Sequence, residues 1–411
     1  MHSARTFVKI PAMTDKTTDK TTVKTSLPQT LCEFLQQTGA TAHFYDMGRR
    51  VVEIPADEML AIENQQKPYP QPFLRSAFLG VLFYYNDVDT KTESHQIWFL
   101  KFPLDEQGLL IQDARNDFLR RMIERLAEQT LAKHALENSE NKESAETNTD
   151  NPPLEVPKDV PEDNPHGFTP RDDRMASFHA IIAKKLNQSP SQYYTHAADY
   201  FTGNTGFEQW NFVGLQGIAD VAARLDEKNN ASTLAKAIPQ LPITPFAALC
   251  SCLENEAIDS DISTALGIRL EHALQNGTPE NAPESDGVAA ANIVAAVIRG
   301  LSHSDDQSIL LVAIDSTLEN EAGNNVEVLA TIAGRAWQCL EDTETRRAFL
   351  QSLARCNAGQ GAFDNIMADL MFIPGLRKPL LTELRHLLDS NNCSTAQTSI
   401  INRFLQSLQT H

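Results

Sequence analysis

The stretch VEVLATIAGRAWQCLEDTETRRAFLQSLARC, residues 326–356, holds two amphipathic helical patterns with almost no loop between them. The small residues of the first pattern allow a neighbouring helix to approach closely, and Asp342 or Thr343 is suited to cap the second helix. Two helices joined so tightly must pack antiparallel, so this stretch predicts a helical hairpin. The apolar stripe of its first helix consists of Val328, Leu329, Ile332, Ala333, Ala336, Trp337 and Leu340.

Similar patterns recur from Arg174 to the end of the chain, and paired helices begin about 34 to 43 residues apart, a period typical of helical-hairpin repeats. Residues 171–409 are therefore predicted to form an all-α domain of stacked helical hairpins, a HEAT-like α-solenoid. No strict repeat consensus is present, so a compact irregular bundle stays open as the alternative. The predicted helix starts lie near Arg174, Ser191, Glu208, Asn230, Pro245, Ile258, Val288, Asp305, Val326, Thr343, Gly361, Leu376 and Thr395.

In residues 27–136 the spacing of apolar residues is different, because stretches with helical periodicity alternate with stretches with strand periodicity. The order is helix, hairpin, helix, hairpin, helix, which predicts a small α+β domain with helices on one side of an antiparallel sheet. In the strand HQIWFLKF the continuous apolar residues 97–100 indicate burial on both faces. Lys101 is then expected where the strand emerges, with its stem along apolar surface and its ammonium in water.

The segment between these regions, residues 137–170, is rich in Glu, Asn, Ser and Pro and poor in large apolar residues. Such a composition buries too little surface to offset the entropy of ordering, so it predicts an acidic, flexible linker. Residues 1–26 are basic and Thr-rich without the apolar core of a secretory signal, and they are predicted to be a disordered tail.

The composition excludes several classes of protein. At 411 residues with 41% hydrophobic and 22% charged residues, the chain belongs to the globular class, and no window has the roughly 18 continuous apolar residues of a membrane helix. A net charge of −19 disfavours nucleic-acid binding by the chain as a whole. Six scattered cysteines without a CxxC pair favour a reducing cytoplasm.

The sequence lacks the common catalytic and metal-binding motifs, and it therefore predicts no enzyme and no cofactor. The chain has no HExxH, GxSxG or GxxxxGK[ST] sequence, and its histidines are scattered rather than clustered. Asp369 with Arg377 and Lys378 is a charged group around the turn at Pro374, and a salt-linked turn is expected there.

Two groups of residues are candidates for interaction with a partner. The run from Gln188 to Asp220 concentrates aromatic side chains, and Tyr193, Tyr194 and Trp210 are candidate anchors in a partner-binding surface, with a core role as the alternative. In the N-terminal domain, Arg49, Arg50, Trp98 and Lys101, with Tyr84 and Tyr85, are candidates for a basic, aromatic surface that stacks single-stranded bases.

The blocks FYDMGRRVVEIP, PYPQPFLRSAFLGVLFYY, IWFLKFPLDEQGLL, SQYYTHAADY, GLQGIAD and IAGRAWQCL together resemble a bacterial family of cytoplasmic proteins known only as a domain of unknown function. The resemblance covers most of residues 27–388. It implies the two-part layout and supplies no activity or catalytic residues.

The function expected from these observations is that of a cytoplasmic, non-enzymatic scaffold or adaptor that binds a protein partner through its helical repeat surface. The alternative is an RNA-associated accessory protein that contacts single-stranded RNA, or an RNA-modifying partner, through the basic and aromatic edge of the N-terminal domain. The sequence leaves the partner and the oligomeric state open.

Overall fold

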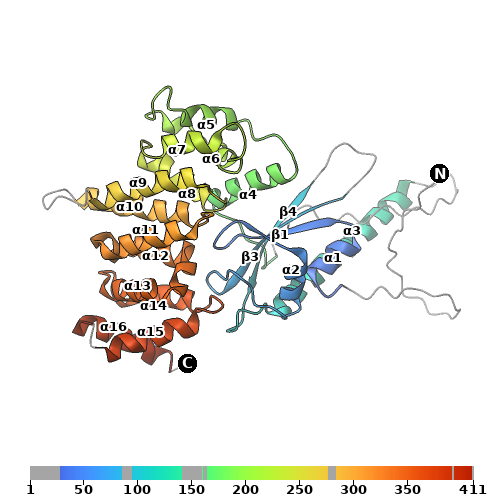
Figure 1. Ribbon diagram of the computed structural model, residues 1–411. Coiled ribbons are helices and arrows are strands. Elements are labelled where there is room, and N and C mark those ends of the chain that lie inside the picture. Colours follow the sequence, from blue (N-terminus) through green and yellow to red (C-terminus); the bar gives the residue numbers. More distant parts are fainter. Residues whose placement is uncertain are drawn as a thin grey trace. The chain divides into compact units, whose positions relative to one another are not determined.

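The computed structural model describes residues 28–85, 95–140, 160, 164–275, 284–390 and 393–409 (Figure 1). The predicted N-terminal tail and most of the predicted linker lie outside these residues. The chain divides into two compact units. Unit 1 comprises residues up to Asp46, Glu53–Tyr69 and Ser76–Thr169; unit 2 comprises Met47–Val52, Pro70–Arg75 and Pro170 onward.

Unit 1 is built on a four-stranded antiparallel sheet with strand order β2-β1-β3-β4. Helices α1, α2 and α3 pack beside it on one face, and the predicted order of helices and hairpins is confirmed (Figure 1). The elements are α1 (Leu31–Gln37), β1 (Thr41–Asp46), β2 (Val52–Ile54), α2 (Ala56–Glu63), β3 (Ser76–Tyr84), β4 (Gln96–Pro103) and α3 (Gln112–Glu140).

Successive side chains of strand β4 point to opposite faces of the sheet, and the two faces differ in burial. Trp98, Leu100 and Phe102 are buried in the core with the helices, and Trp98 makes edge contacts with Phe83 and Phe118 at ring-centroid distances of 4.7 and 5.6 Å. The prediction that residues 97–100 are buried on both faces is therefore wrong, because Ile97 and Phe99, which point to the other face, are only partly buried.

Lys101 lies on the less buried face of the sheet and is exposed. Its ammonium stands 5.0 Å from the centre of the Phe78 ring, and Phe78 is its partner in the register of β3 and β4. Residues at the end of the predicted linker also pair with β4: the Lys101 amide donates to the His166 carbonyl at 2.8 Å, and the Phe168 amide donates to the Phe99 carbonyl at 3.2 Å.

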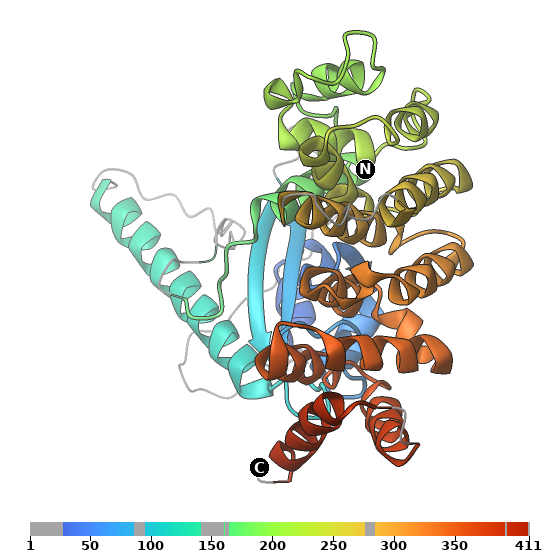
Figure 2. The same cartoon turned by 90° about the vertical axis from the view of Figure 1, so that its left-hand side faces the viewer.

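Unit 2 consists of helices in two stacked rows. One row runs α4, α6, α8, α10, α12, α14, and the other runs α5, α7, α9, α11, α13, with α15 and α16 packed on α13. In Figures 1 and 2 successive helix pairs lie one below another in chain order from α9 and α10 to α15 and α16. The stacking of antiparallel hairpins follows from the short connections between helices.

The helices of unit 2 begin close to the predicted positions, except that the helix predicted near Glu208 begins only at Leu215, after a 3-10 turn. Their bounds are α4 (Asp172–Lys185), α5 (Tyr194–Phe201), α6 (Leu215–Ala222), α7 (Asn230–Ala237), α8 (Ile243–Leu253), α9 (Ser260–Gln275), α10 (Glu284–Leu301), α11 (Gln307–Glu319), α12 (Val326–Arg335), α13 (Thr343–Arg355), α14 (Gly359–Leu370), α15 (Arg377–Asp389) and α16 (Thr395–Ser407), with 3-10 turns η1 (Trp210–Phe212), η2 (Glu321–Asn324) and η3 (Trp337–Glu341).

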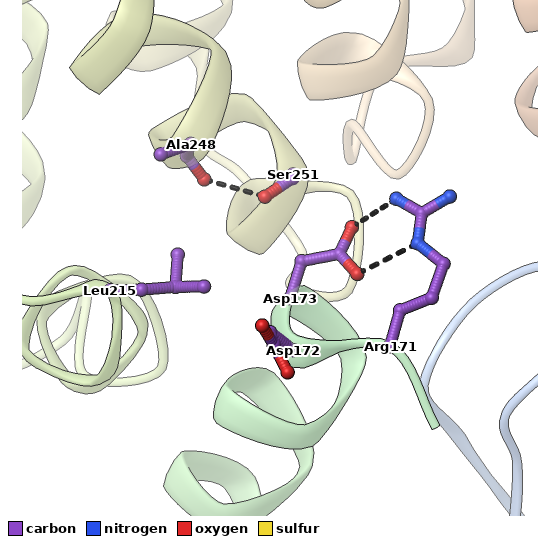
Figure 3. Close-up of a pocket in the computed structure, with 6 residues that line it drawn as sticks. All are labelled: Arg171, Asp172, Asp173, Leu215, Ala248 and Ser251. Carbon is purple, nitrogen blue, oxygen red and sulfur yellow. Dashed lines mark hydrogen bonds and ion pairs between the residues drawn. The ribbon is translucent and has the colours of Figure 1, made fainter. Parts of the chain in front are cut away.

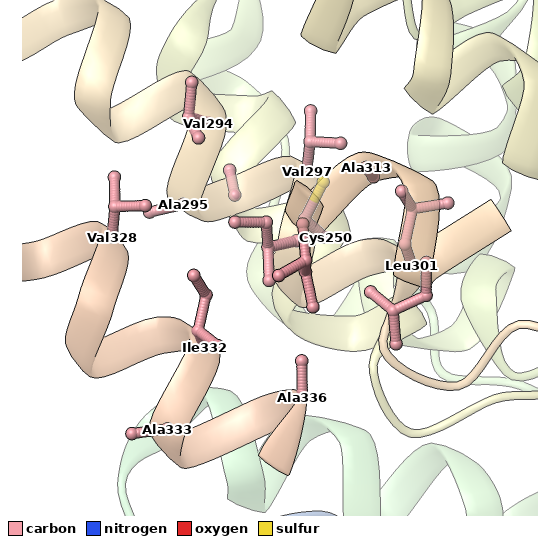
Figure 4. Packing of buried hydrophobic residues seen from close by; sticks show 14 of the residues in the cluster. Cys250, Val294, Ala295, Val297, Leu301, Ala313, Val328, Ile332, Ala333 and Ala336 are labelled. Atoms are coloured by element: carbon pink, nitrogen blue, oxygen red, sulfur yellow. The ribbon is translucent and has the colours of Figure 1, made fainter. Parts of the chain in front are cut away.

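The core between the rows is made of aliphatic and small side chains from α8, α10, α11 and α12 (Figure 4). At Gly300 on α10 a Cβ atom would lie only 3.1 Å from the Cys250 sulfur and 3.2 Å from Leu266, so glycine permits this close approach. Cys250 is fully buried, and burial raises the pKa of its thiol, which makes it a packing residue rather than a nucleophile.

The helix predicted over residues 326–340 is broken. Helix α12 ends at Arg335, and Ala336 leaves the helical conformation with φ −122° and ψ 28°. The 3-10 turn η3 follows, and the ring of Trp337 lies under two guanidinium groups, those of Arg49 and Arg50, at 5.2 and 4.8 Å. The apolar period of the sequence does not reveal this break, and the residues that contact it, Arg49 and Arg50, lie in a distant part of the chain.

Candidate functional site: a charged cluster and an adjoining hollow

A charged cluster lies within unit 2 at the ends of successive helices of the first row. Glu254 caps the C-terminus of α8, Arg299 is in the last turn of α10, and Arg335 ends α12. Cations are favoured at helix C-termini, where they face the negative end of the helix dipole. Asp173 and Arg174 come from the first turn of α4.

Glu254 is the centre of this cluster and is fully buried. Its carboxylate accepts from both Nε and Nη2 of Arg299, lies 2.9 Å from Nη2 of Arg174, and lies 3.1 Å from Nε of Arg335. Burial alone would raise the pKa of Glu254, but the three guanidinium groups outweigh it, and the pKa is lowered. Glu254 is therefore held ionised.

The pKa values of Arg299 and Arg335 shift in opposite directions, although both arginines lie beside Glu254. Burial disfavours the charge on Arg299, but the carboxylates of Glu254 and Asp173 outweigh that effect and raise its pKa. Burial, aided by the neighbouring guanidinium groups, lowers the pKa of Arg335 to about 9 despite Glu254. Asp173 is also buried enough to disfavour its charge, yet Arg171 and Arg299 lower its pKa to about 2.

The cluster binds a segment of the chain that lies far away in sequence, Met47–Val52. The main-chain carbonyl of Arg49 accepts from Nη2 of Arg174 at 2.6 Å and from Nη1 of Arg335 at 2.9 Å. The amide of Val51 donates to Oδ1 of Asn255 at 2.8 Å. The bend at Gly48–Arg50 is thus held through its backbone groups, contacts that do not depend on side-chain identity.

The side chain of Arg49 is fully buried and anchors the same segment. Its guanidinium donates to the carbonyls of Pro72 and Ala333 at 2.8 and 3.2 Å and to Oδ2 of Asp369 at 2.7 Å. The other oxygen of Asp369 accepts from the Leu74 amide at 3.1 Å. Asp369 therefore joins the segments 47–52 and 70–75 to α14, instead of forming the expected salt-linked turn.

Arg50 is buried as well, at 5% exposure. Its Nη2 donates to the Arg335 carbonyl at 2.7 Å and to Oε1 of Gln338 at 3.1 Å. The predicted surface of Arg49, Arg50, Trp98 and Lys101 is consequently wrong as a surface. The two arginines and Trp98 are buried, since polar helix ends and an apolar core enclose them, and of these four only Lys101 is exposed.

The aromatic candidates divide in the same way. Tyr193 and Trp210 are exposed, at 50% and 36%. Tyr194 is buried and its hydroxyl accepts from the Asn230 side chain at 3.1 Å, so its predicted role as an exposed anchor is wrong. Phe212, which the sequence did not single out as a candidate, is 70% exposed at the end of η1.

An open hollow of about 530 Å³ adjoins the charged cluster (Figure 3). Asp173 belongs to both, because one carboxylate holds Arg299 of the cluster and Arg171 at the rim of the hollow. The lining residues are Arg171, Asp172, Asp173, Leu215, Ala248 and Ser251.

The described residues meet neither the requirements of a metal site nor those of a membrane-spanning helix. Among them no three His, Cys, Asp or Glu side chains gather closely enough to hold a metal ion. None of the helices in the described ranges is long and apolar enough to cross a membrane.

A family model described as "Protein of unknown function (DUF3549)" matches residues 28–401. No curated protein and no solved structure matches the chain.

Proposed function

The chain belongs to the DUF3549 family of proteins of unknown function, and from the geometry of unit 2 we propose that it is a cytoplasmic, non-enzymatic scaffold that binds a protein partner. The proposal treats the stacked hairpins as a HEAT-like array whose surface recognises polypeptide, as helical repeat arrays do by stacking their hairpins into an extended binding surface.

The observation that carries the proposal is the binding of Met47–Val52 within unit 2. Two arginines grip one backbone carbonyl, an asparagine accepts a backbone amide, and Trp337 stacks under two arginine side chains. The row of helix ends therefore has groups suited to binding main-chain amides and carbonyls of a polypeptide, here used on a bend of the protein itself.

Exposed aromatic side chains support the proposal from a second part of the unit. Tyr193 packs its ring near Gly214, where a Cβ atom would lie 3.7 Å from it. Phe212 is two residues away from Gly214, with Val213 extended between them at φ −90° and ψ 112°. Phe212 and Tyr193 therefore both lie near Gly214, Phe212 along the chain and Tyr193 through contact. Large exposed aromatics carry much of the energy of protein interfaces.

The alternative function, contact with single-stranded RNA, required Arg49, Arg50 and Trp98 to be exposed, and all three are buried. Stacking of bases requires exposed rings, and Trp98 is fully buried, while Arg49 and Arg50 are engaged inside unit 2. No other observation favours RNA, so the scaffold is the single function proposed.

Affinity capture from the native cell tests the proposal. Tagged full-length protein is compared with the variants Phe212→Ala and Trp210→Ala and with Val312→Ala as the matched control, because Val312 is 65% exposed on α11, away from η1. Half of each sample is treated with RNase before mass spectrometry. We expect protein partners that survive RNase, fall at least tenfold with Phe212→Ala, and persist with Val312→Ala.

Partners that disappear on RNase treatment would contradict the scaffold and return the function to RNA. Capture that is equal for all three variants would show that η1 is not part of the interface. Circular dichroism of each variant excludes loss of fold as the cause.

A further inference from the structure

We propose that the hollow lined by Asp172, Leu215 and Ala248 receives the basic side chain of a lysine or arginine from the protein partner, while an adjacent apolar residue of that partner lies on Phe212 and Tyr193. This inference deepens the proposed function, on which it rests, by giving the chemical class of the partner segment.

The charge of the hollow selects a cation. The carboxylate of Asp173 is committed to Arg171, at 2.7 Å, and to Arg299, at 2.9 Å. In the described part of the chain, no hydrogen bond or ion pair engages the carboxylate of Asp172, which is exposed at the rim. One carboxylate is thus available to a ligand, and it lies beside a second one.

An anion is a poor fit for the same site. Arg171 is the single cationic side chain in the lining, and both its Nε and its Nη2 are occupied by Asp173, at 3.2 and 2.7 Å. An incoming carboxylate or phosphate would displace that pair and approach Asp172 against like charge. The net charge of −19 adds a long-range attraction for basic segments.

The walls suit the stem of a long basic side chain. Leu215 and Ala248 supply an apolar side opposite the carboxylates (Figure 3). Lysine and arginine lay their methylene groups along such surfaces and keep the charged end in a polar environment. The volume of about 530 Å³ falls in the range of roughly 300–1,000 Å³ common for small-ligand sites and exceeds one side chain, so part of the partner backbone enters too.

The aromatic surface continues from the apolar wall. Leu215 begins α6 three residues after Phe212, and Gly214 between them adjoins the Tyr193 ring. A basic residue in the hollow therefore has its sequence neighbours on the side of Leu215, toward the Tyr193 ring beside Gly214 and toward η1, which carries Phe212. The recognised pattern is a basic residue next to an aliphatic or aromatic one.

The test uses three small probes and the full-length protein. 4-Phenylbutylamine carries a cation and an apolar group, 4-phenylbutanol lacks the charge, and 4-phenylbutyrate reverses it. Dissociation constants are measured by ligand-observed NMR titration. We expect the amine to bind at least tenfold more tightly than the alcohol, and the butyrate more weakly than either. Raising the salt concentration should weaken binding of the amine alone.

Variants of the lining residues test whether the probes bind in the hollow. Asp172→Asn should reduce affinity for the amine at least fivefold and leave the alcohol unchanged. Ala248→Ile narrows the hollow and should weaken both probes. Asp261→Asn is the matched control, because Asp261 is likewise an exposed aspartate in the first turn of a helix, α9, and does not line the hollow.

Equal binding of amine and alcohol, or an unchanged amine affinity in Asp172→Asn, would overturn the inference. Such a result leaves the scaffold proposal standing if Phe212→Ala still abolishes capture of a partner. Conversely, Asp172-dependent binding of the amine together with the loss of all captured partners on RNase treatment would retain the cation site and refute the scaffold.

Discussion

Among the described residues, unit 1 and unit 2 each bury one glutamate completely, and the pKa values of the two carboxylates shift in opposite directions. Glu63, at the end of α2, accepts from the backbone amides of Leu31 and Cys32 at 2.6 and 3.1 Å, at the N-terminus of α1. Burial raises its pKa, although these amides and Arg115 oppose the shift. Glu254 lies among three arginines that lower its pKa.

The difference separates two ways of burying a charge. A helix N-terminus satisfies Glu63 with neutral donors from one neighbouring element. Glu254 is stabilised only when three helices and the segment 47–52 have assembled, since Arg174 and Arg335 each also bind the carbonyl of Arg49. One arrangement is local, and the other depends on the complete assembly of unit 2.

The largest effect is expected when the isosteric variants Glu254→Gln and Glu63→Gln are compared. Removing the charge of Glu254 leaves buried arginines uncompensated, and we expect unit 2 to lose about 3–5 kcal/mol of unfolding free energy. Glu63→Gln keeps an oxygen that can accept from Leu31 and should cost about 1 kcal/mol in unit 1. Hydrogen exchange with peptide resolution reports each unit separately. Similar losses in both units would refute the distinction.

Lowering the pH should destabilise unit 2 through protonation of Asp173. The pKa of this group is about 2 in the folded protein and 3.8 when exposed, so its stabilisation is present above pH 4 and is lost as the pH falls toward 2. The loss amounts to about 2 kcal/mol.

Urea unfolding followed by circular dichroism between pH 5 and pH 2 measures this effect. The variant Asp173→Asn should show a shallower pH dependence, while Asp172→Asn should match the wild type. The raised pKa of Glu63 has the opposite sign, because its contribution is complete below pH 4.5 and declines as the pH rises above that value. An identical slope in Asp173→Asn and wild type would exclude Asp173 as the titrating group.

Arg49→Lys keeps the positive charge at this position and removes the planar guanidinium group. It therefore separates the contribution of charge from that of hydrogen-bond geometry. A lysine can reach Asp369 but cannot also donate to the carbonyls of Pro72 and Ala333, as the planar guanidinium does. We expect a loss of about 2 kcal/mol in the same urea assay. Arg355→Lys, at an exposed position on α13, is the control and should change stability by less than about 0.5 kcal/mol. Equal effects would mean that only the charge of Arg49 matters.

The smallest effect is expected in unit 1, at Lys101→Met. The methionine retains an apolar stem on the sheet and loses the cation over the Phe78 ring, an exposed contact that contributes roughly 0.5 kcal/mol. Thermal unfolding should therefore shift only slightly, in line with Lys67→Met at another exposed lysine. A loss above about 2 kcal/mol would show that Lys101 has a structural partner of greater importance.

The elements of both units could be predicted because their signals are local. The helix starting at Val326 and the one capped by Asp342 follow from apolar period and capping, and the side chain of Asp342 does accept the amides of Glu344 and Thr345. The break after Arg335 could not be predicted. It places Trp337 against arginines almost 290 positions earlier, and no local pattern encodes that contact.

The candidate site was the part least accessible to sequence reasoning. Arg49 and Arg50 stand out as a basic pair, and a basic pair normally lies on the surface. Their burial depends on Asp369, on carbonyls at helix ends and on Trp337, which only the assembled unit brings together. Glu254 and Arg299 carry a weaker signal, as charged residues directly beside strongly apolar helical runs.

The segment 47–52 also has a consequence for synthesis on the ribosome. Its contacts within unit 2 span increasing distances along the chain: 125 positions to Arg174, 285 to the carbonyl of Arg335, and 320 to Asp369. At about 5–20 residues per second, the segment waits roughly 15–60 s after its own translation for the last of these partners. We expect nascent chains that stop before α14 to present Gly48–Val51 to chaperones and proteases, and completed chains to withdraw it.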